Sequence, residues 1–188
     1  MTPTSYIELS KSALITNLKF IHSLIDDKVE FISVVKGNAY GHGIDSYALL
    51  VSDCGIKRFA VSSSQEAWEL HQTGIQLDRL IIMGAVPDED MPWAIEHGIE
   101  LFIFNYRTIN KIVQLAQHFN KTAKIHIELE TGLNRTGFPQ NQWGKLISLL
   151  IEQKDHLDIK GICSHLAGAE DVSNDLRIKK QVEIFNSA

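Results

Sequence analysis

The sequence predicts an α/β protein in which helices cover a parallel sheet. Short β-branched and apolar runs alternate with longer segments whose apolar residues recur at helical spacing. Six such runs alternate strictly with helical segments, the pattern of parallel strands joined by helical crossovers. The 188 residues, 44% of them apolar and 22% charged, are typical of one globular domain with a real core.

The elements follow in a regular order. Ser10 can cap a first helix that extends to about residue 26, because Leu14, Leu18 and Ile21 recur at helical spacing. The expected strands cover residues 31–36, 59–61, 80–83, 101–104, 125–130 and 159–165. Further helices are expected at residues 45–53, 64–72, 89–97, 105–120, 140–152 and 176–185, and glycines at 55, 74 and 98 close three helices.

Two layouts fit this order of elements: a (β/α)8 barrel and an open doubly wound sheet. A complete barrel takes about 200 residues or more. After the last helical segment, at residues 176–185, a barrel would still need two strands. A barrel built from this chain would therefore be truncated after about six βα units.

Charge and apolar patterning narrow the class of partner. The 18 basic and 23 acidic residues give a formal charge of −5 and are scattered, which argues against nucleic acid and anionic membranes as partners. No apolar run approaches the ~20 residues that span a bilayer. Residues 1–6 lack the basic and apolar regions of a signal peptide, so a cytoplasmic location is expected. Cys54 and Cys163 lie in apolar stretches outside metal-binding spacing, and we expect buried thiols.

Lys36 begins the most distinctive run of the sequence, KGNAYGHG at residues 36–43. A lysine at the carboxyl end of a barrel strand points into the mouth of the barrel, where catalytic groups lie. The three glycines of the run allow the backbone to turn sharply and to approach a ligand. From these residues alone, a solvated lysine before a glycine-rich turn is the better explanation of the run.

The run closely resembles the cofactor-lysine signature of the alanine racemase family and differs chiefly at Gly37, where alanine is usual. The resemblance implies a TIM-barrel fold in which Lys36 holds pyridoxal 5′-phosphate as a Schiff base. Once freed by the substrate, Lys36 would act as the base on one face of the α-carbon. Tyr40 would lie near the cofactor phosphate.

A second block, ELETGLNRTGF at residues 128–138, resembles the strand and loop of this family that end in T-G-x-x-R-x-G. The resemblance implies that Arg135 hydrogen-bonds the phenolic oxygen of the cofactor and helps to bind the substrate carboxylate. Many family members have a carbamylated lysine where Glu128 stands. Because glutamate already has a carboxylate, Glu128 can hold Arg135 through a charge-assisted pair. By itself, the block fits an ordinary surface arginine.

A third block, GICSHLAGAE at residues 161–170, resembles the S/T-H-F-A-x-A-D/E segment of the family. The resemblance implies that His165 packs against the face of the cofactor ring and transfers no proton. By itself, a histidine at a strand end is more often a structural hydrogen-bonding group.

The resemblance extends from about residue 6 to residue 185 but covers only the N-terminal half of an alanine racemase. We therefore expect residues 1–188 to form an incomplete N-terminal pyridoxal-phosphate-binding barrel domain, without the C-terminal β-domain that supplies the opposite base across a homodimer. Such a chain by itself would racemise alanine poorly or not at all.

Three functions remain open. The leading hypothesis is a pyridoxal-phosphate-dependent racemase that interconverts L- and D-alanine, takes a small amino acid as substrate and is a homodimer at full length. The second is a non-catalytic pyridoxal-phosphate-binding barrel protein. The third is a metal-dependent barrel hydrolase with His126, Glu128, Glu130 and His165 as ligands, which would leave the Lys36 run unexplained.

Overall fold

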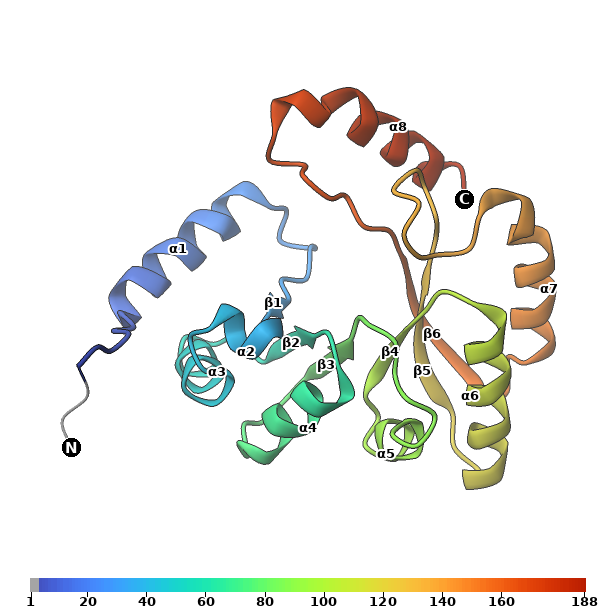
Figure 1. Ribbon diagram of the computed structural model, residues 1–188, viewed down its shortest axis with the longest axis horizontal. Helices are drawn as coiled ribbons and strands as arrows, with labels where there is room; N and C mark the ends of the chain where they lie inside the picture. Colours follow the sequence, from blue (N-terminus) through green and yellow to red (C-terminus); the bar gives the residue numbers. More distant parts are fainter. Residues whose placement is uncertain (1–3) are drawn as a thin grey trace. The chain divides into compact units, whose positions relative to one another are not determined.

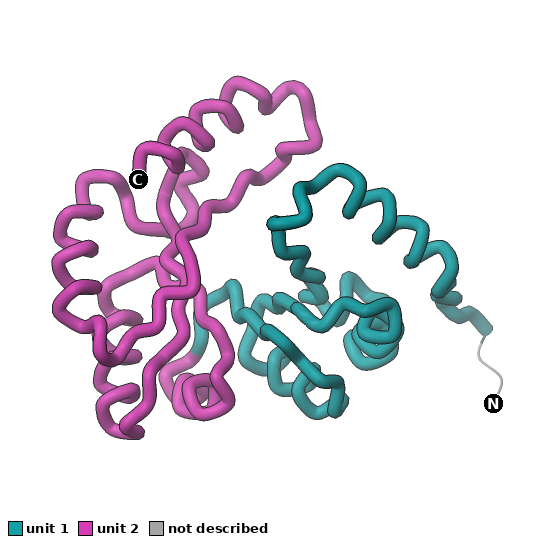
Figure 2. The backbone as a smooth tube through the Cα atoms, turned by 180° about the vertical axis from the view of Figure 1, so that it is seen from behind, with its two compact units in different colours: residues 1–86 teal, residues 87–188 magenta. Residues whose placement is uncertain are grey.

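The computed structural model describes residues 4–188. Residues 1–3, part of the N-terminal segment that was expected to be no signal peptide, lie outside the described residues. The chain forms two compact units, residues 1–86 and residues 87–188 (Figure 2). Each unit alternates parallel strands with helices, which confirms the predicted α/β class.

The first unit has a three-stranded parallel sheet in which β2 pairs with both β1 and β3. Phe59 of β2 lies opposite Ser33 of β1 and Leu80 of β3. Helix α4 packs against β2 and β3, as Figure 1 shows. The elements of this unit are α1 (Lys11–Leu24), β1 (Ser33–Val34), α2 (Lys36–Tyr40), α3 (Ile44–Asp53), β2 (Arg58–Val61), α4 (Ser64–Gln72) and β3 (Arg79–Ile82).

In the second unit, β5 is the central strand and pairs in parallel with β4 and β6. Helix α5 packs against β4, and helix α6 packs against β5 (Figure 1). The elements of this unit are α5 (Met91–Glu96), β4 (Glu100–Ile103), α6 (Tyr106–Phe119), β5 (Ala123–Glu128), η1 (Gln140–Gln142), α7 (Trp143–Glu152), β6 (Leu157–Cys163), η2 (Val172–Asn174) and α8 (Asp175–Asn186).

Local chemistry sets most of the helix ends. The Ser10 hydroxyl accepts a hydrogen bond from the Ala13 amide, as predicted. The side chain of Asn105 caps α6 in the same way, through the Thr108 amide at 2.9 Å. The glycines that follow α3, α4 and α5 all have positive φ, which confirms their predicted place after the ends of these helices.

Three expectations differ from the structure. The first strand spans only Ser33–Val34, because Lys36 begins a turn with a different backbone conformation. Helix α5 begins two residues later than expected, at Met91, with a proline in its first turn. Cys54 and Cys163 are free thiols that are only half-buried, not buried as expected.

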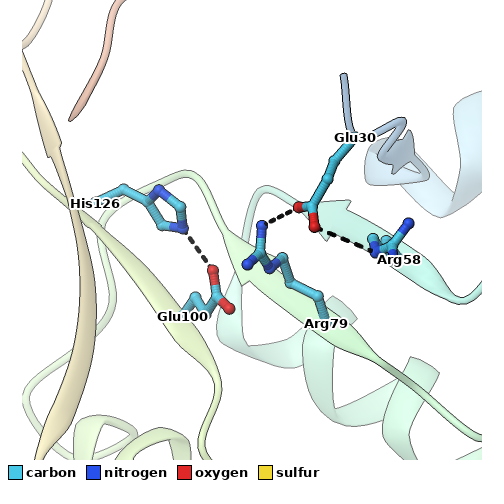
Figure 3. A network of polar contacts seen from close by, with 5 residues as sticks. All are labelled: Glu30, Arg58, Arg79, Glu100 and His126. Carbon is cyan, nitrogen blue, oxygen red and sulfur yellow. Dashed lines mark hydrogen bonds and ion pairs between the residues drawn. The ribbon is translucent and has the colours of Figure 1, made fainter. Parts of the chain in front are cut away.

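Two charged clusters lie on the strands and on the segment that precedes β1 (Figure 3). In the first unit, Glu30 accepts a hydrogen bond from Arg79 at 2.6 Å and lies 3.9 Å from Arg58. In the second unit, the Nε2 atom of His126 lies 2.5 Å from a carboxylate oxygen of Glu100, and both side chains are buried. Sequence reasoning named His126 but not Glu100, its partner.

No helix among the residues described is long and apolar enough to cross a membrane.

The core of the second unit generates the first prediction. Ile112 of α6 is fully buried, whereas Ile147 of α7 is 53% exposed. We expect Ile112→Ala to lower the free energy of unfolding by about 2–5 kcal/mol, because the truncation leaves a cavity. The same truncation at Ile147 should cost less than about 1 kcal/mol. Urea unfolding of both variants measures the difference, and equal losses would contradict the packing described.

Candidate active site

Lys36 follows directly on the first strand. Val35 is fully buried, and its amide donates to the Ala60 carbonyl at 2.9 Å, which continues the pairing of β1 with β2. The side chain of Lys36 is half-exposed. Within residues 4–188 it makes no hydrogen bond and no ion pair. Its amine is therefore not engaged by the side chains and backbone of the described residues.

The residues after Lys36 form a left-handed helical turn, labelled α2 in Figure 1. Gly37, Asn38, Ala39 and Tyr40 have φ values of 62°, 53°, 53° and 54°. Asparagine tolerates the left-handed conformation, but for Ala39 and Tyr40 it costs about 1–2 kcal/mol per residue. This stretch of the backbone is therefore strained and needs stabilising contacts from its surroundings.

Several contacts stabilise this turn from within. The Ala39 amide donates to the Val35 carbonyl at 2.8 Å, and the Gly41 amide donates to the Gly37 carbonyl at 3.0 Å. The side-chain oxygen of Asn38 accepts from the Ile44 amide at 2.8 Å, which links the turn to the start of α3. Tyr40 is 64% exposed, so its ring projects into solvent from the same turn as Lys36.

In the second unit, the loop that contains Arg135 is closed at its base. The Phe138 amide donates to the Glu128 carbonyl at 2.9 Å, and the Glu130 amide donates to the Phe138 carbonyl at 3.1 Å. At Gly137 the φ angle is 113°, and a Cβ atom would lie 2.5 Å from the Glu130 nitrogen. Only glycine fits this crossing, which explains the second glycine of the block.

Glu128 and Arg135 are brought together as the sequence predicts. A carboxylate oxygen of Glu128 lies 4.0 Å from the Arg135 guanidinium and accepts a hydrogen bond from the Thr136 hydroxyl at 2.9 Å. The Glu128 side chain is only 7% exposed, whereas that of Arg135 is 57% exposed. Glu128 is thus a fixed anion at the base of the loop, and Arg135 extends from it into solvent.

The strand end that contains His165 is tied to the Arg135 loop. The hydroxyls of Thr131 and Ser164 lie 2.6 Å apart. The buried amide of Gln181 donates to the Thr131 hydroxyl at 3.2 Å and to the His165 carbonyl at 3.1 Å. The imidazole of His165 is exposed. This network fixes two of the three sequence blocks with respect to each other.

The metal-ligand hypothesis is not supported. His126 pairs with Glu100, Glu128 bonds Thr136, and Glu130 accepts from the Gly132 amide of its own loop. Across the part of the chain that the structure describes, no group of three or more histidine, cysteine, aspartate or glutamate side chains could hold a metal ion.

Lys36 and Tyr40 belong to the first unit, and Arg135, Glu128 and His165 belong to the second.

Sequence reasoning missed two residues of these sites. Gln181 is a buried polar residue on α8, and its position in an otherwise amphipathic helix was the only signal in the sequence. Glu66 hydrogen-bonds the turn after Lys36. Its sequence signal was ambiguous, because Ser63 and Glu66 have the spacing of a helix-capping pair.

Residues 9–188 match the sequence family described as the N-terminal domain of alanine racemase, so the chain belongs to this family. An alanine racemase of Methanococcus maripaludis is 31% identical over 88% of the chain and 44% of its own length. Alanine racemase 1 of Oceanobacillus iheyensis is 30% identical over 98% of the chain and 50% of its own length. The chain thus spans about half the length of these relatives.

A solved alanine racemase from Streptomyces lavendulae superposes with a TM-score of 0.86 and 25% identity, over 94% of the chain and 46% of the neighbour. An alanine racemase from Bacillus anthracis, solved with bound L-Ala-P, gives a TM-score of 0.82 and 29% identity over 94% of the chain and 45% of its own. Between the two layouts left open by the sequence, these neighbours decide for the TIM-barrel type, of which this chain contains six βα units.

The left-handed turn gives a second prediction. Gly37 and Gly144 both have open space around an added Cβ, but only Gly37 has positive φ, at 62°. We expect Gly37→Ala to destabilise the chain by about 1–2 kcal/mol. Gly144→Ala, in helix α7, should stabilise it by up to about 1 kcal/mol, because alanine loses less backbone entropy. Urea unfolding of both variants and the parent measures the change in the free energy of unfolding. A Gly37→Ala variant as stable as the parent would contradict the left-handed turn.

Cys163 gives a third prediction. Burial, and secondly the negative charge of Glu128, raise the pKa of the Cys163 thiol from 9.0 to about 12. We expect the rate of its alkylation by iodoacetamide to keep rising with pH beyond pH 10, because only the thiolate reacts. Glu128→Gln should shift this profile to lower pH. Mass spectrometry of the Cys163 peptide measures the rates, and a plateau near pH 9 would refute the prediction.

Proposed function

We propose that this chain is the pyridoxal-phosphate-binding half of an alanine racemase that interconverts L- and D-alanine. The observation that supports the proposal most directly is Lys36, which follows the first strand on a strained turn and whose amine has no partner among residues 4–188. Family membership supports the reaction class, and the names of the relatives support alanine as the substrate.

The residues described fit such a cofactor. Lys36 supplies a free primary amine, Arg135 an exposed guanidinium held near a buried carboxylate, and Tyr40 an exposed hydroxyl. When bound, pyridoxal 5′-phosphate withdraws electrons from the substrate and makes its Cα proton acidic. The protein has to supply a covalent anchor, a base and groups that orient the bound molecule.

Each of the site residues named from the sequence has a role in the proposal. Lys36 would anchor the cofactor through Nζ and, when released, would hold the proton taken from the α-carbon of the substrate. Tyr40 would donate a hydrogen bond to the phosphate of the cofactor, and His165 would pack against the cofactor. Arg135 would donate to a cofactor oxygen and bind the substrate carboxylate. Glu128 orients Arg135, because its charge is buried and fixed by Thr136.

The proposal includes assembly and location. The half of the relatives that this chain does not match would supply the opposite base, and the enzyme would act as a cytoplasmic homodimer. Gel filtration with light scattering on a chain joined to the second half of a relative tests the dimer. A monomer that racemises alanine would contradict this part of the proposal.

Cofactor capture tests the proposal as a whole. We expect the 188-residue chain to form a borohydride-reducible adduct with pyridoxal 5′-phosphate at Lys36, found by peptide mass spectrometry. Lys36→Ala should abolish the adduct, whereas Lys19→Ala, in helix α1, should leave it unchanged. Adduct spread equally over surface lysines would refute the proposal. Capture at Lys36 without racemisation in the joined chain would favour the non-catalytic binding protein.

A further inference from the structure

Glu66 lies beside the strained turn and uses both carboxylate oxygens. Its Oε1 atom accepts from the Gly37 amide at 2.5 Å and, more weakly, from the Asn38 amide at 3.4 Å. Its Oε2 atom accepts from the amide and the hydroxyl of Ser62, at 3.0 and 2.9 Å. One side chain on α4 thereby joins the end of β2 to the first residues after Lys36.

The geometry is that of an anion held by consecutive backbone amides. Successive N–H groups in a left-handed or turn conformation form a concave site for negative charge. Here the charge comes from the chain itself, and the Gly37 amide makes no backbone hydrogen bond within the described residues. Without the Glu66 carboxylate, the two amides next to Lys36 would lack a strong acceptor.

The charge state of Glu66 agrees with this arrangement. Burial by itself would raise the pKa of the carboxyl, but the hydrogen bonds from Ser62, Gly37 and Asn38 outweigh burial and hold the pKa below its ordinary value of 4.5. Because the pKa is lowered in the folded chain, the stabilisation is fully present above pH 4.5. It is lost as the pH falls through the lowered value.

A simpler role for Glu66 is to cap α4. The Ser63 hydroxyl accepts from the Glu66 amide at 3.2 Å, which is one half of a capping box. The other half would be a bond from the Glu66 carboxylate back to the Ser63 amide. The carboxylate instead bonds Ser62 and Gly37, so it reaches beyond its own helix.

We propose that Glu66 is the positioning residue for Lys36: its carboxylate fixes the left-handed turn from the Gly37 side and thereby sets the direction of the lysine. This inference rests on the proposed function of Lys36. Glu66 itself touches neither the Lys36 amine nor, in this account, the cofactor. Glu66 affects the capture of pyridoxal 5′-phosphate by Lys36 only through the backbone of the turn.

Three variants separate positioning from capping. Glu66→Ala removes both roles. Glu66→Asp keeps a negative charge in the first turn of α4, which suits the helix, but is one methylene too short to hold Gly37 and Ser62 together. Glu69→Ala is the matched control, because Glu69 lies on the same helix, is half-buried like Glu66 and bonds only Gln65 among the contacts described.

The first measurement is the rate of borohydride-trapped capture of pyridoxal 5′-phosphate at Lys36. We expect Glu66→Ala and Glu66→Asp to slow it at least about tenfold, the loss expected for a charged hydrogen bond. Glu69→Ala should leave it unchanged. Equal rates in the parent and Glu66→Asp would overturn the proposal, as would a loss in Glu69→Ala of the same size.

The second measurement needs no cofactor. Amide hydrogen exchange at Gly37 and Asn38, followed by NMR, should be at least about tenfold faster in Glu66→Asp than in the parent, while the amides of α4 keep their protection. In the parent alone, the Gly37 amide resonance should titrate below pH 4.5. Unchanged exchange at Gly37 overturns the positioning role. A parent chain that fails to capture the cofactor overturns only the proposed function of Lys36.

Discussion

The strained turn after the first strand is the constraint on which the site in the first unit depends. A chain that leaves β1 in a regular right-handed helix would send the residues after Lys36 in another direction. The left-handed conformation is unfavourable for Ala39 and Tyr40, so it persists only because other groups hold it. Hydrogen bonds within the turn, the Asn38 side chain and the Glu66 carboxylate provide this hold.

In the second unit, the loop that contains Arg135 is fixed by other contacts. Its loop is closed at the base by a backbone crossing that only Gly137 permits, and it is tied to the neighbouring strand end by Thr131, Ser164 and Gln181. Glu128 is buried beneath the exposed Arg135. The two units thus present polar side chains from rigid backbone, which costs less entropy when a ligand binds than mobile loops would.

Hydrophobic periodicity was sufficient to predict the order and type of nearly every element, because each strand and helix has a clear apolar face. The pairing of Glu128 with Arg135 also followed from the sequence. Glu66 and Gln181 did not, because their partners are backbone atoms or residues distant in sequence, and their local patterns fit ordinary helix positions. The left-handed turn was hidden for a related reason: the glycines predicted a sharp turn, but three of its four residues are not glycine.

The central claim is that a left-handed turn presents Lys36 to pyridoxal 5′-phosphate. A crystal structure of the chain grown with this cofactor tests it most directly. We predict continuous electron density from the Lys36 Nζ atom to the cofactor, positive φ from Gly37 to Tyr40, and the Glu66 carboxylate within hydrogen-bond distance of the Gly37 amide. Density joined to another lysine, or a right-handed backbone at these four residues, would contradict the account.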